Sequence, residues 1–435
     1  MRMRTLTLLA DARRRAAGHR WLALCVFLGF ASVAAAARPT GGPSKVLSDT
    51  WALAHVEVDA LATADGKALA DATVVVQGGV VRCVGVCVLA GEIPVHDARG
   101  IKLLPGLVEV GSELGLVEIS LEPHSHDGAA GHAENLAHVR ARDGLAVDSA
   151  VVAAARWGGV LAAVTAPQGG ALVAGTAVAF RTAGPGPSAA TLVESAGVFV
   201  RLGDAGRRDD RPLVGARSGQ IAMLRALLRA ASELPAANAG EAVPRGLERS
   251  SDREALLALA EVIAGRQPLV VQAHRAEDIT AALGLQKSFG LRLIILGGAE
   301  AWLVAAELAA AKVPVVLSPG RAKPYRFETA RARDDAALIL QRAGVRVAIA
   351  SGRTHELRNL RWEAGALVGL GMAAPAALAA ISTVPAALFG IADRLGVRVG
   401  KPPLFVLVRG DLLGLDGQIA GVAVGGELEV EPRQR

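Results

Sequence analysis

From about residue 106 to residue 385, short apolar runs alternate with stretches rich in Ala and Leu that have helical period. The clearest runs are Leu269–Ala273, Leu293–Leu296, Val313–Leu317 and Val345–Ala350. The spacings between the first of these runs leave room for a single crossover helix each, which is typical of βα units around a parallel sheet. About 280 residues of this pattern suit a (β/α)₈ barrel of the TIM type, whose usual length is about 250 residues.

The two ends of the chain have a β pattern instead. Ala72–Val76 and Val80–Val84 flank Gln77-Gly78-Gly79, which is a hairpin signal. Strand-like runs return near the other end, at Leu404–Val408, Ile419–Val424 and Glu427–Val430. We therefore predict an α/β fold in which residues 104–390 form the barrel. Residues 50–103 and 391–432 are the two parts of a small β-sandwich domain formed from both chain ends.

The N-terminus has the features of an export signal. Residues 1–37 hold six arginines and one acid, and the apolar run Trp21–Val33 is followed by four alanines. A positive flank, a short apolar core and a small-residue end are typical of a secretory signal peptide. We expect residues 1–37 to be removed, leaving an exported protein, periplasmic or extracellular, with no stable membrane span. The alternative is an N-terminal membrane anchor, because the apolar stretch approaches the shortest spanning length.

Composition excludes nucleic acid as a partner. The net charge is +6, but the mature chain after residue 37 keeps only +1, so no basic groove is expected. Aromatic residues make up 3% of the chain, with a single tyrosine, which leaves no platform for base stacking. The expected partner is a small-molecule ligand or substrate, and nothing in the sequence specifies an oligomeric state.

Two cysteines, Cys83 and Cys87, remain after the signal segment. On a straight strand their Cα atoms would lie about 13 Å apart, which is beyond disulfide reach. Only a turn at Gly85 would close that distance. Two small buried thiols are the favoured interpretation, although an oxidising compartment leaves pairing open.

Several motifs in order along the chain resemble one enzyme family. They are the opening hairpin around Gln77–Val81, then Asp97–Gly100, Leu104–Val108, Asn359–Gly365, Ala376–Pro385 and Gly400-Lys401. Their order and spacing resemble the amidohydrolase superfamily, most of all its imidazolonepropionase-related branch. The resemblance implies a hydrolase acting on carbon–nitrogen bonds other than peptide bonds. In that family one or two divalent metals at the C-terminal mouth of the barrel activate water.

The resemblance also implies where the metal ligands should be, and most of those positions carry other residues. Gly111 and Glu113 replace the H-x-H pair after strand one, whereas His274 matches the histidine after strand five. The segments after strands six and eight, 296–300 and 350–353, hold no matching His or Asp. A catalytic zinc usually needs three protein ligands, so we expect a degenerate metal site. No cofactor is expected unless an altered site binds a divalent metal of the zinc class.

The candidates for an altered site are few. Glu113, His274 and His355 are the predicted catalytic residues, with Glu113 as a general base. His274 and Glu113 are also the candidate metal ligands, and His124 and His126 form a second, more speculative pair in the segment after strand one. The competing interpretations are a hydrogen-bonded histidine in a former active site and a solvated His-rich loop.

Two functions follow from these observations. The first is an exported hydrolase of carbon–nitrogen bonds with an altered site, favoured by the motif resemblance. The alternative is a pseudoenzyme, a non-catalytic protein derived from an amidohydrolase that binds a small ligand or a partner. The low number of ligands at the family positions favours this alternative.

Overall fold

The computed structural model describes residues 45–47, 49–89, 91–129, 133–207, 214–234, 253–318 and 326–430. The predicted signal segment 1–37 lies outside this range.

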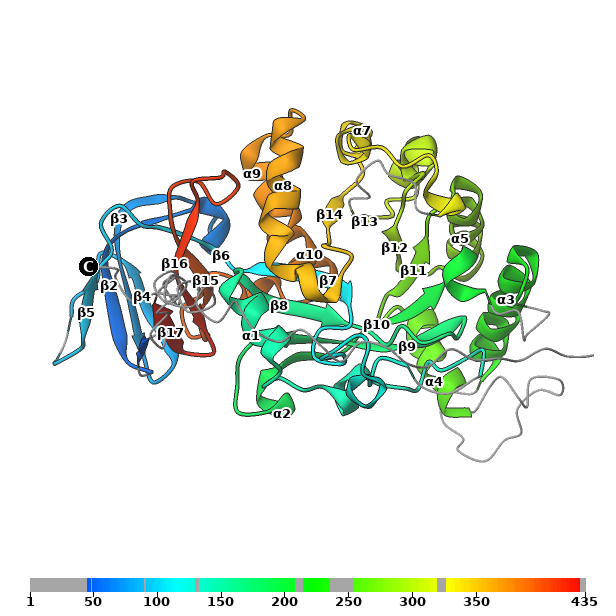
Figure 1. Ribbon diagram of the computed structural model, residues 1–435, viewed down its shortest axis with the longest axis horizontal. Coiled ribbons are helices and arrows are strands. Elements are labelled where there is room, and N and C mark those ends of the chain that lie inside the picture. Colours follow the sequence, from blue (N-terminus) through cyan, green and yellow to red (C-terminus); the bar gives the residue numbers. More distant parts are fainter. Residues whose placement is uncertain are drawn as a thin grey trace, which may run out of the picture. The chain divides into compact units, whose positions relative to one another are not determined.

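An eight-stranded sheet forms the larger part of the fold (Figure 1). In spatial order its strands are β14 (Val347–Ile349), β13 (Val315–Leu317), β12 (Leu293–Gly297), β11 (Leu269–Ala273), β10 (Thr191–Arg201), β9 (Val173–Arg181), β8 (Val160–Thr165) and β7 (Leu107–Ser112). The sheet curls into a nearly closed barrel, and the four strands predicted most clearly from the apolar runs are confirmed as β11 to β14.

One strand departs from the predicted parallel arrangement. β9 pairs antiparallel with both β8 and β10, whereas the other neighbouring strands pair in parallel. Residues 166–172, which join β8 to β9, are too few for the helical crossover that a parallel connection requires. The barrel is therefore a mixed sheet and departs from an ideal (β/α)₈ barrel at its third strand.

Helices cover the sheet because each presents an apolar face to it. In α4, the buried residues Ala255, Leu256, Leu259 and Val262 follow helical spacing. The α-helices are α1 (Ala150–Trp157), α2 (Pro187–Ala190), α3 (Arg217–Glu233), α4 (Arg253–Ile263), α5 (Ala276–Phe289), α6 (Ala305–Ala310), α7 (Ala336–Arg342), α8 (Leu360–Gly369), α9 (Ala374–Ala380) and α10 (Thr383–Leu388). No helix within the described ranges is both long and apolar enough to span a membrane.

Short 3-10 helices lie mostly in the loops at the strand ends. They are η1 (Ala60–Ala62), η2 (Pro123–Ser125), η3 (Ala141–Gly144), η4 (Gly203–Gly206), η5 (Ala301–Val304), η6 (Phe327–Thr329), η7 (Thr354–Asn359) and η8 (Ala392–Arg394).

A second sheet combines strands from both ends of the chain. Its order is β1 (Lys45–Leu47), β17 (Glu427–Val430), β16 (Gln418–Val424), β15 (Leu404–Arg409), β6 (Lys102–Pro105), β2 (Trp51–Val58), β3 (Leu69–Gln77) and β4 (Val80–Gly85), with β5 (Val95–Asp97) beside β2. Trp51 and Phe405 meet edge to face in its core, with ring centroids 6.2 Å apart. The joint contribution of the two chain ends agrees with the sequence prediction, while the two-layered sandwich and the domain limits stay predictions.

The hairpin at the edge of this sheet is confirmed, and it corrects the prediction for the cysteines. β3 and β4 are joined by Gly78 and Gly79, both at positive φ, as a tight two-residue turn requires. Cys83, which lies within β4, and Cys87, just after that strand, form a disulfide with Cα atoms 5.9 Å apart. The preference for two buried thiols is wrong because Gly85, at φ +105°, turns the chain between them.

Candidate functional site

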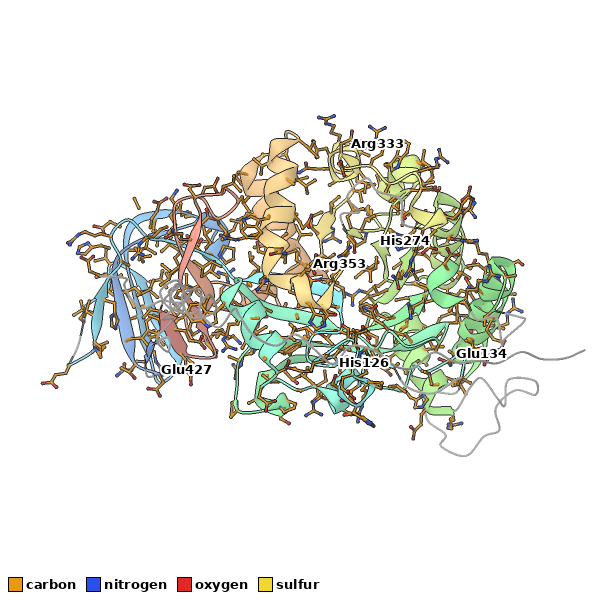
Figure 2. The ribbon with its side chains drawn as sticks, in the orientation of Figure 1. His126, Glu134, His274, Arg333, Arg353 and Glu427 are labelled. Atoms are coloured by element: carbon orange, nitrogen blue, oxygen red, sulfur yellow. A yellow bond between two sulfur atoms is a disulfide. The ribbon has the colours of Figure 1, made fainter. Side chains whose placement is uncertain are left out.

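The candidate site lies at the C-terminal ends of the parallel strands, where the functional residues of barrel enzymes are found. Glu113 follows β7, Arg201 ends β10, His274 follows β11 and Ser351 follows β14. Figure 2 labels His274 beside the β11–β12 part of the sheet and Arg353 on the β14 side.

Glu113 is half-buried, and a hydrogen bond from its backbone N–H fixes its position. Its N–H donates to Thr354 Oγ1 at 3.2 Å, which ties the end of β7 to η7. Its carboxylate lies directly against Gly128, where any larger side chain would collide with it. Burial raises the pKa of Glu113, and the neighbouring charges of Arg201 and His126 oppose that shift. A carboxyl with a raised pKa in a sheltered site is suited to general base chemistry.

Arg201 is the charged neighbour of Glu113, and the sequence reasoning missed it. Its Nη1 donates to the carbonyl oxygen of Gln168, and the Gln168 amide donates to the carbonyl oxygen of Gly111. Burial lowers the pKa of Arg201, whereas the charge of Glu113 raises it. A guanidinium remains charged at neutral pH, so Arg201 supplies a fixed positive charge beside Glu113. The signal available in the sequence was an arginine directly after the apolar run Val198-Phe199-Val200.

His274 is sheltered and neutral. Its pKa is lowered to about 4, mainly by burial and also by the charge of nearby Arg326, while the charge of Asp204 opposes the shift. Its Nδ1 is buried and has no hydrogen-bond partner within the described ranges. The ring is packed on Gly297, where an added Cβ would lie 2.7 Å from Cε1. At neutral pH His274 therefore presents a neutral imidazole, which can accept a hydrogen bond through its unprotonated ring nitrogen.

An apolar side chain fills the space beside Gly111, the first position of the family's H-x-H pair. A Cβ at Gly111 would lie 2.7 Å from Leu296 Cδ2, and the backbone of Gly111 has φ +74°. Leu296 comes from β12, whose end is the segment that carries no strand-six histidine. A larger residue at position 111 would therefore require Leu296 to move.

The remaining predicted histidines lie in exposed loops. Nε2 of His355 lies 2.7 Å from Ser120 Oγ, and Nε2 of His126 lies 2.9 Å from the Ser120 carbonyl oxygen. His124 is exposed in η2. The structure therefore brings His355 and His126 together at Ser120, on the loop that follows β7.

No group of three His, Cys, Asp or Glu residues in the described ranges is arranged to hold a metal ion. Glu113 and His274 thus lack a third such ligand among these residues, and so does the His124–His126 pair. The catalytic and metal-binding roles assigned from the sequence stay predictions.

Glu109, a second residue that the sequence reasoning missed, lies within β7 and is fully buried. Its two carboxyl oxygens accept the Ser351 N–H at 3.1 and 3.0 Å, and Oε1 also accepts the Ser351 hydroxyl at 3.0 Å. β7 and β14 are the two ends of the barrel sheet and share no ladder pairing in the described strands. Glu109 therefore bridges the seam of the barrel just below the candidate site, and burial raises its pKa to about 8.

A network of ion pairs joins the loops after β10 and β13, on the side of the mouth away from the β7–β14 seam. Arg217 contacts Asp204 and Asp278, each at 3.2 Å, and Asp204 N–H donates to the buried Glu328 at 2.9 Å. Burial raises the pKa of Glu328. Because Glu328 belongs to η6, this network fixes the segment that places Arg326 near His274.

The comparisons with known proteins agree with the motifs. No family model matches the sequence. The chain is 28% identical over 350 residues to the amidohydrolase tasK of Hapsidospora irregularis, a match that covers 69% of this chain. The match covers 34% of that protein, so this chain spans about a third of its length.

Solved structures share the fold. An amidohydrolase from Thermotoga maritima superposes with a TM-score of 0.77 at 22% identity, covering 88% of this chain and 100% of that one. A prolidase complexed with N-methylphosphonate-L-proline gives a TM-score of 0.54 at 15% identity, covering 88% and 100%. Molinate hydrolase gives 0.52 at 16% identity, covering 87% and 94%. In its sequence motifs and in its fold, this chain resembles the amidohydrolase superfamily.

Proposed function

We propose that this protein is a hydrolase acting on a carbon–nitrogen bond other than a peptide bond, at the C-terminal mouth of its barrel. The observation that carries the proposal is the placement of Glu113, Arg201 and His274 at that mouth, in a fold shared with amidohydrolases. The amidohydrolase relative in sequence supports the same reaction class.

The proposed chemistry uses the side chains of this chain. Glu113 takes a proton from water, whose oxygen attacks the substrate's carbonyl or equivalent carbon. Arg201 stabilises the negative charge that develops on the carbonyl oxygen. When the carbon–nitrogen bond breaks, the leaving nitrogen takes up the proton held by Glu113. His274, which is neutral and sheltered, accepts a hydrogen bond from the substrate and so orients the substrate.

The described donors do not fit the metal set of the family. Leu296 fills the space beside Gly111, and Glu113 and His274 have no third His, Cys, Asp or Glu in a metal-binding arrangement within the described ranges. Nδ1 of His274 has no hydrogen-bond partner among the described residues and is a nitrogen that could ligate a metal. Elemental analysis of wild type and His274→Ala, purified without a metal-binding tag, tests whether an altered site binds zinc, manganese or iron.

A hydrolysis screen of amides, lactams and N-acyl compounds tests the activity. We expect Glu113→Gln to lower kcat/KM on any substrate found by about 10²- to 10⁴-fold, since a general base contributes that much. Glu122→Gln is the matched control, because Glu122 lies exposed in the same loop after β7 and its carboxylate accepts the His124 N–H. Equal rates for wild type and Glu113→Gln would rule out this role of Glu113.

A binding protein without catalysis is the second candidate, and Leu296 favours it, since an apolar side chain lies where the family places a ligand. Saturable binding of compounds from the same screen without turnover would favour this candidate over the hydrolase.

We also propose that the protein acts outside the cytoplasm. The arginine-rich N-terminus and the apolar run after it support export, and so does the Cys83–Cys87 disulfide, because such bonds persist in oxidising compartments. Cell fractionation and N-terminal sequencing of the mature protein test this. An intact N-terminus in the membrane fraction would identify the anchor instead.

A further inference from the structure

A cavity of about 480 Å³ lies between the second sheet and the barrel, well away from the candidate site. Its walls include Arg156 at the end of α1 and Arg181 at the end of the antiparallel β9, together with the β16–β17 turn. Both arginines lie at the N-terminal end of the parallel strands, since α1 leads into β8 and β9 runs the other way. The mouth with Glu113 and His274 is at the opposite end. The volume is within the range of about 300 to 1,000 Å³ that is usual for small-molecule sites.

One wall of the cavity is a buried ion pair that fixes its shape. Arg156 Nε lies 3.0 Å from Glu429 Oε1, with side chains only 17% and 7% exposed. Arg156 Nη1 also donates to the Thr182 carbonyl oxygen at 2.6 Å. These contacts join α1, the end of β9 and β17. The charges of Arg156 and Glu429 thus neutralise each other in this wall of the cavity, although Glu429 Oε2 has no hydrogen-bond partner among the described residues.

The other charged groups of the cavity are available to a ligand. Arg181 uses its Nε to bond the Ala183 carbonyl oxygen at 3.1 Å, and no ion pair within the described ranges engages its terminal nitrogens. Burial lowers the pKa of Arg181, so this half-buried cation is incompletely stabilised by its surroundings. Gly425 permits this arrangement, because an added Cβ there would lie 3.4 Å from Arg181 Cζ.

Negative charge lies next to this cation without pairing to it. The charge of Glu427 acts on Arg181 and raises its pKa, yet the two side chains form no ion pair within 4.0 Å. Glu427 and Asp148 are both exposed and both line the cavity (Figure 2 labels Glu427). The cavity therefore offers a positive and a negative group as neighbours, with space left between them.

From this arrangement we propose that the cavity is a binding site for a small zwitterion of the α-amino acid class. The carboxylate and ammonium of an α-amino acid are attached to one carbon atom, so the protein charges that bind them must be neighbours, as Arg181 and Glu427 are. The guanidinium of Arg181 binds the carboxylate, an interaction that suits its planar donor geometry. Glu427 and Asp148 accept hydrogen bonds from the ammonium, and the remaining volume takes the side chain.

Calorimetry and thermal unfolding of the full mature chain test the proposal. The probes are L-leucine, L-aspartate and L-lysine, with L-leucinamide and N-acetyl-L-leucine as compounds that carry only one of the two charges. We expect at least one amino acid to bind and to raise Tm by mass action. The amide and the N-acetyl compound should bind at least about tenfold more weakly than L-leucine or not at all.

The variants are Arg181→Gln and Glu427→Gln, each expected to weaken binding at least about tenfold. Glu427 is exposed, so its variant keeps the test valid if Arg181→Gln does not fold. Arg409→Gln, an exposed arginine on β15 outside the cavity, is the matched control and should bind normally. Glu113→Gln should also bind normally, which separates this site from the mouth. No binding of any probe amino acid at about 10 mM, unchanged binding in both cavity variants, or loss of binding in Glu113→Gln would each overturn the proposal.

Discussion

The buried carboxyl of Glu109 provides the sharpest test of the barrel, because it should make stability depend on pH. Its side chain is completely buried between β7 and Ser351, and burial raises its pKa from 4.5 to about 8. Between those pH values the folded protein binds a proton that the unfolded chain has released. The free energy of unfolding must therefore fall as pH rises through this interval.

The size of the effect follows from the shift. Each pKa unit corresponds to about 1.4 kcal/mol, so the interval from pH 4.5 to above pH 8 removes about 5 kcal/mol of stability, of which about 3 kcal/mol is lost by pH 7. Glu109→Gln keeps the shape and one acceptor oxygen for Ser351 but carries no titrating proton. The variant should gain stability relative to wild type as pH rises, by up to about 1.4 kcal/mol per pH unit.

Denaturant unfolding at pH 5, 7 and 9 measures this difference directly, once reversibility is established. Glu92→Gln, at an exposed position of the second sheet's loops, is the control for the loss of one carboxyl. Ser351→Ala perturbs the same contact from the other strand while leaving the backbone N–H to donate. Parallel stability curves for wild type and Glu109→Gln across the three pH values would refute the reasoning.

Three further results are expected. His274, with a folded pKa of about 4 against 6.5 unfolded, should cost up to about 3 kcal/mol of stability as pH falls from 6.5 to 4, and denaturation of His274→Gln over that range should lack this loss. Replacing both Cys83 and Cys87 by Ser should lower the free energy of unfolding by about 2 kcal/mol, given the short loop, and an unchanged Tm would contradict it. Gly111→Ala should destabilise by about 1 to 3 kcal/mol, and a double-mutant cycle with Leu296→Ala should show coupling of about 0.5 kcal/mol or more, whereas simple additivity would disprove the contact.

Periodicity was sufficient to predict most of the barrel. Leu269–Ala273 and Leu293–Leu296 are continuous apolar runs with one helix between them, and a parallel pair buried on both faces follows from that pattern. The direction of β9 did not follow, because Val173–Phe180 reads as a buried strand whichever way it runs. The direction of β9 is indicated only by the short connection 166–172, which leaves no room for a crossover helix. Because this segment is rich in glycine, its ends could not be located from the sequence.

The candidate site was predictable only in part. His274 and Glu113 were both found through the motif resemblance, which implies functional residues after strands five and one. Glu109 lies inside the strand run Leu107–Ser112, where a single acid only interrupts the apolar pattern. Its partner Ser351 is 242 positions away, so no local pattern predicts their hydrogen bond. Arg201 was missed for the same reason, since its importance depends on its charge near Glu113 and its hydrogen bond to Gln168, which no local pattern contains.

The second sheet has a consequence for the timing of folding during synthesis. β15 pairs with β6, and β1 pairs with β17. Strands that are synthesised early therefore cannot form these pairs until the later strands have been synthesised. Lys45 is opposite Val430, so residues 45–430 must all be synthesised before that pair forms. Until β15 is made, β6 has a free edge that is open to incorrect pairing. All strands of the barrel, β7 to β14, are synthesised before β15, so the barrel sheet has all its strands while the second sheet is still incomplete.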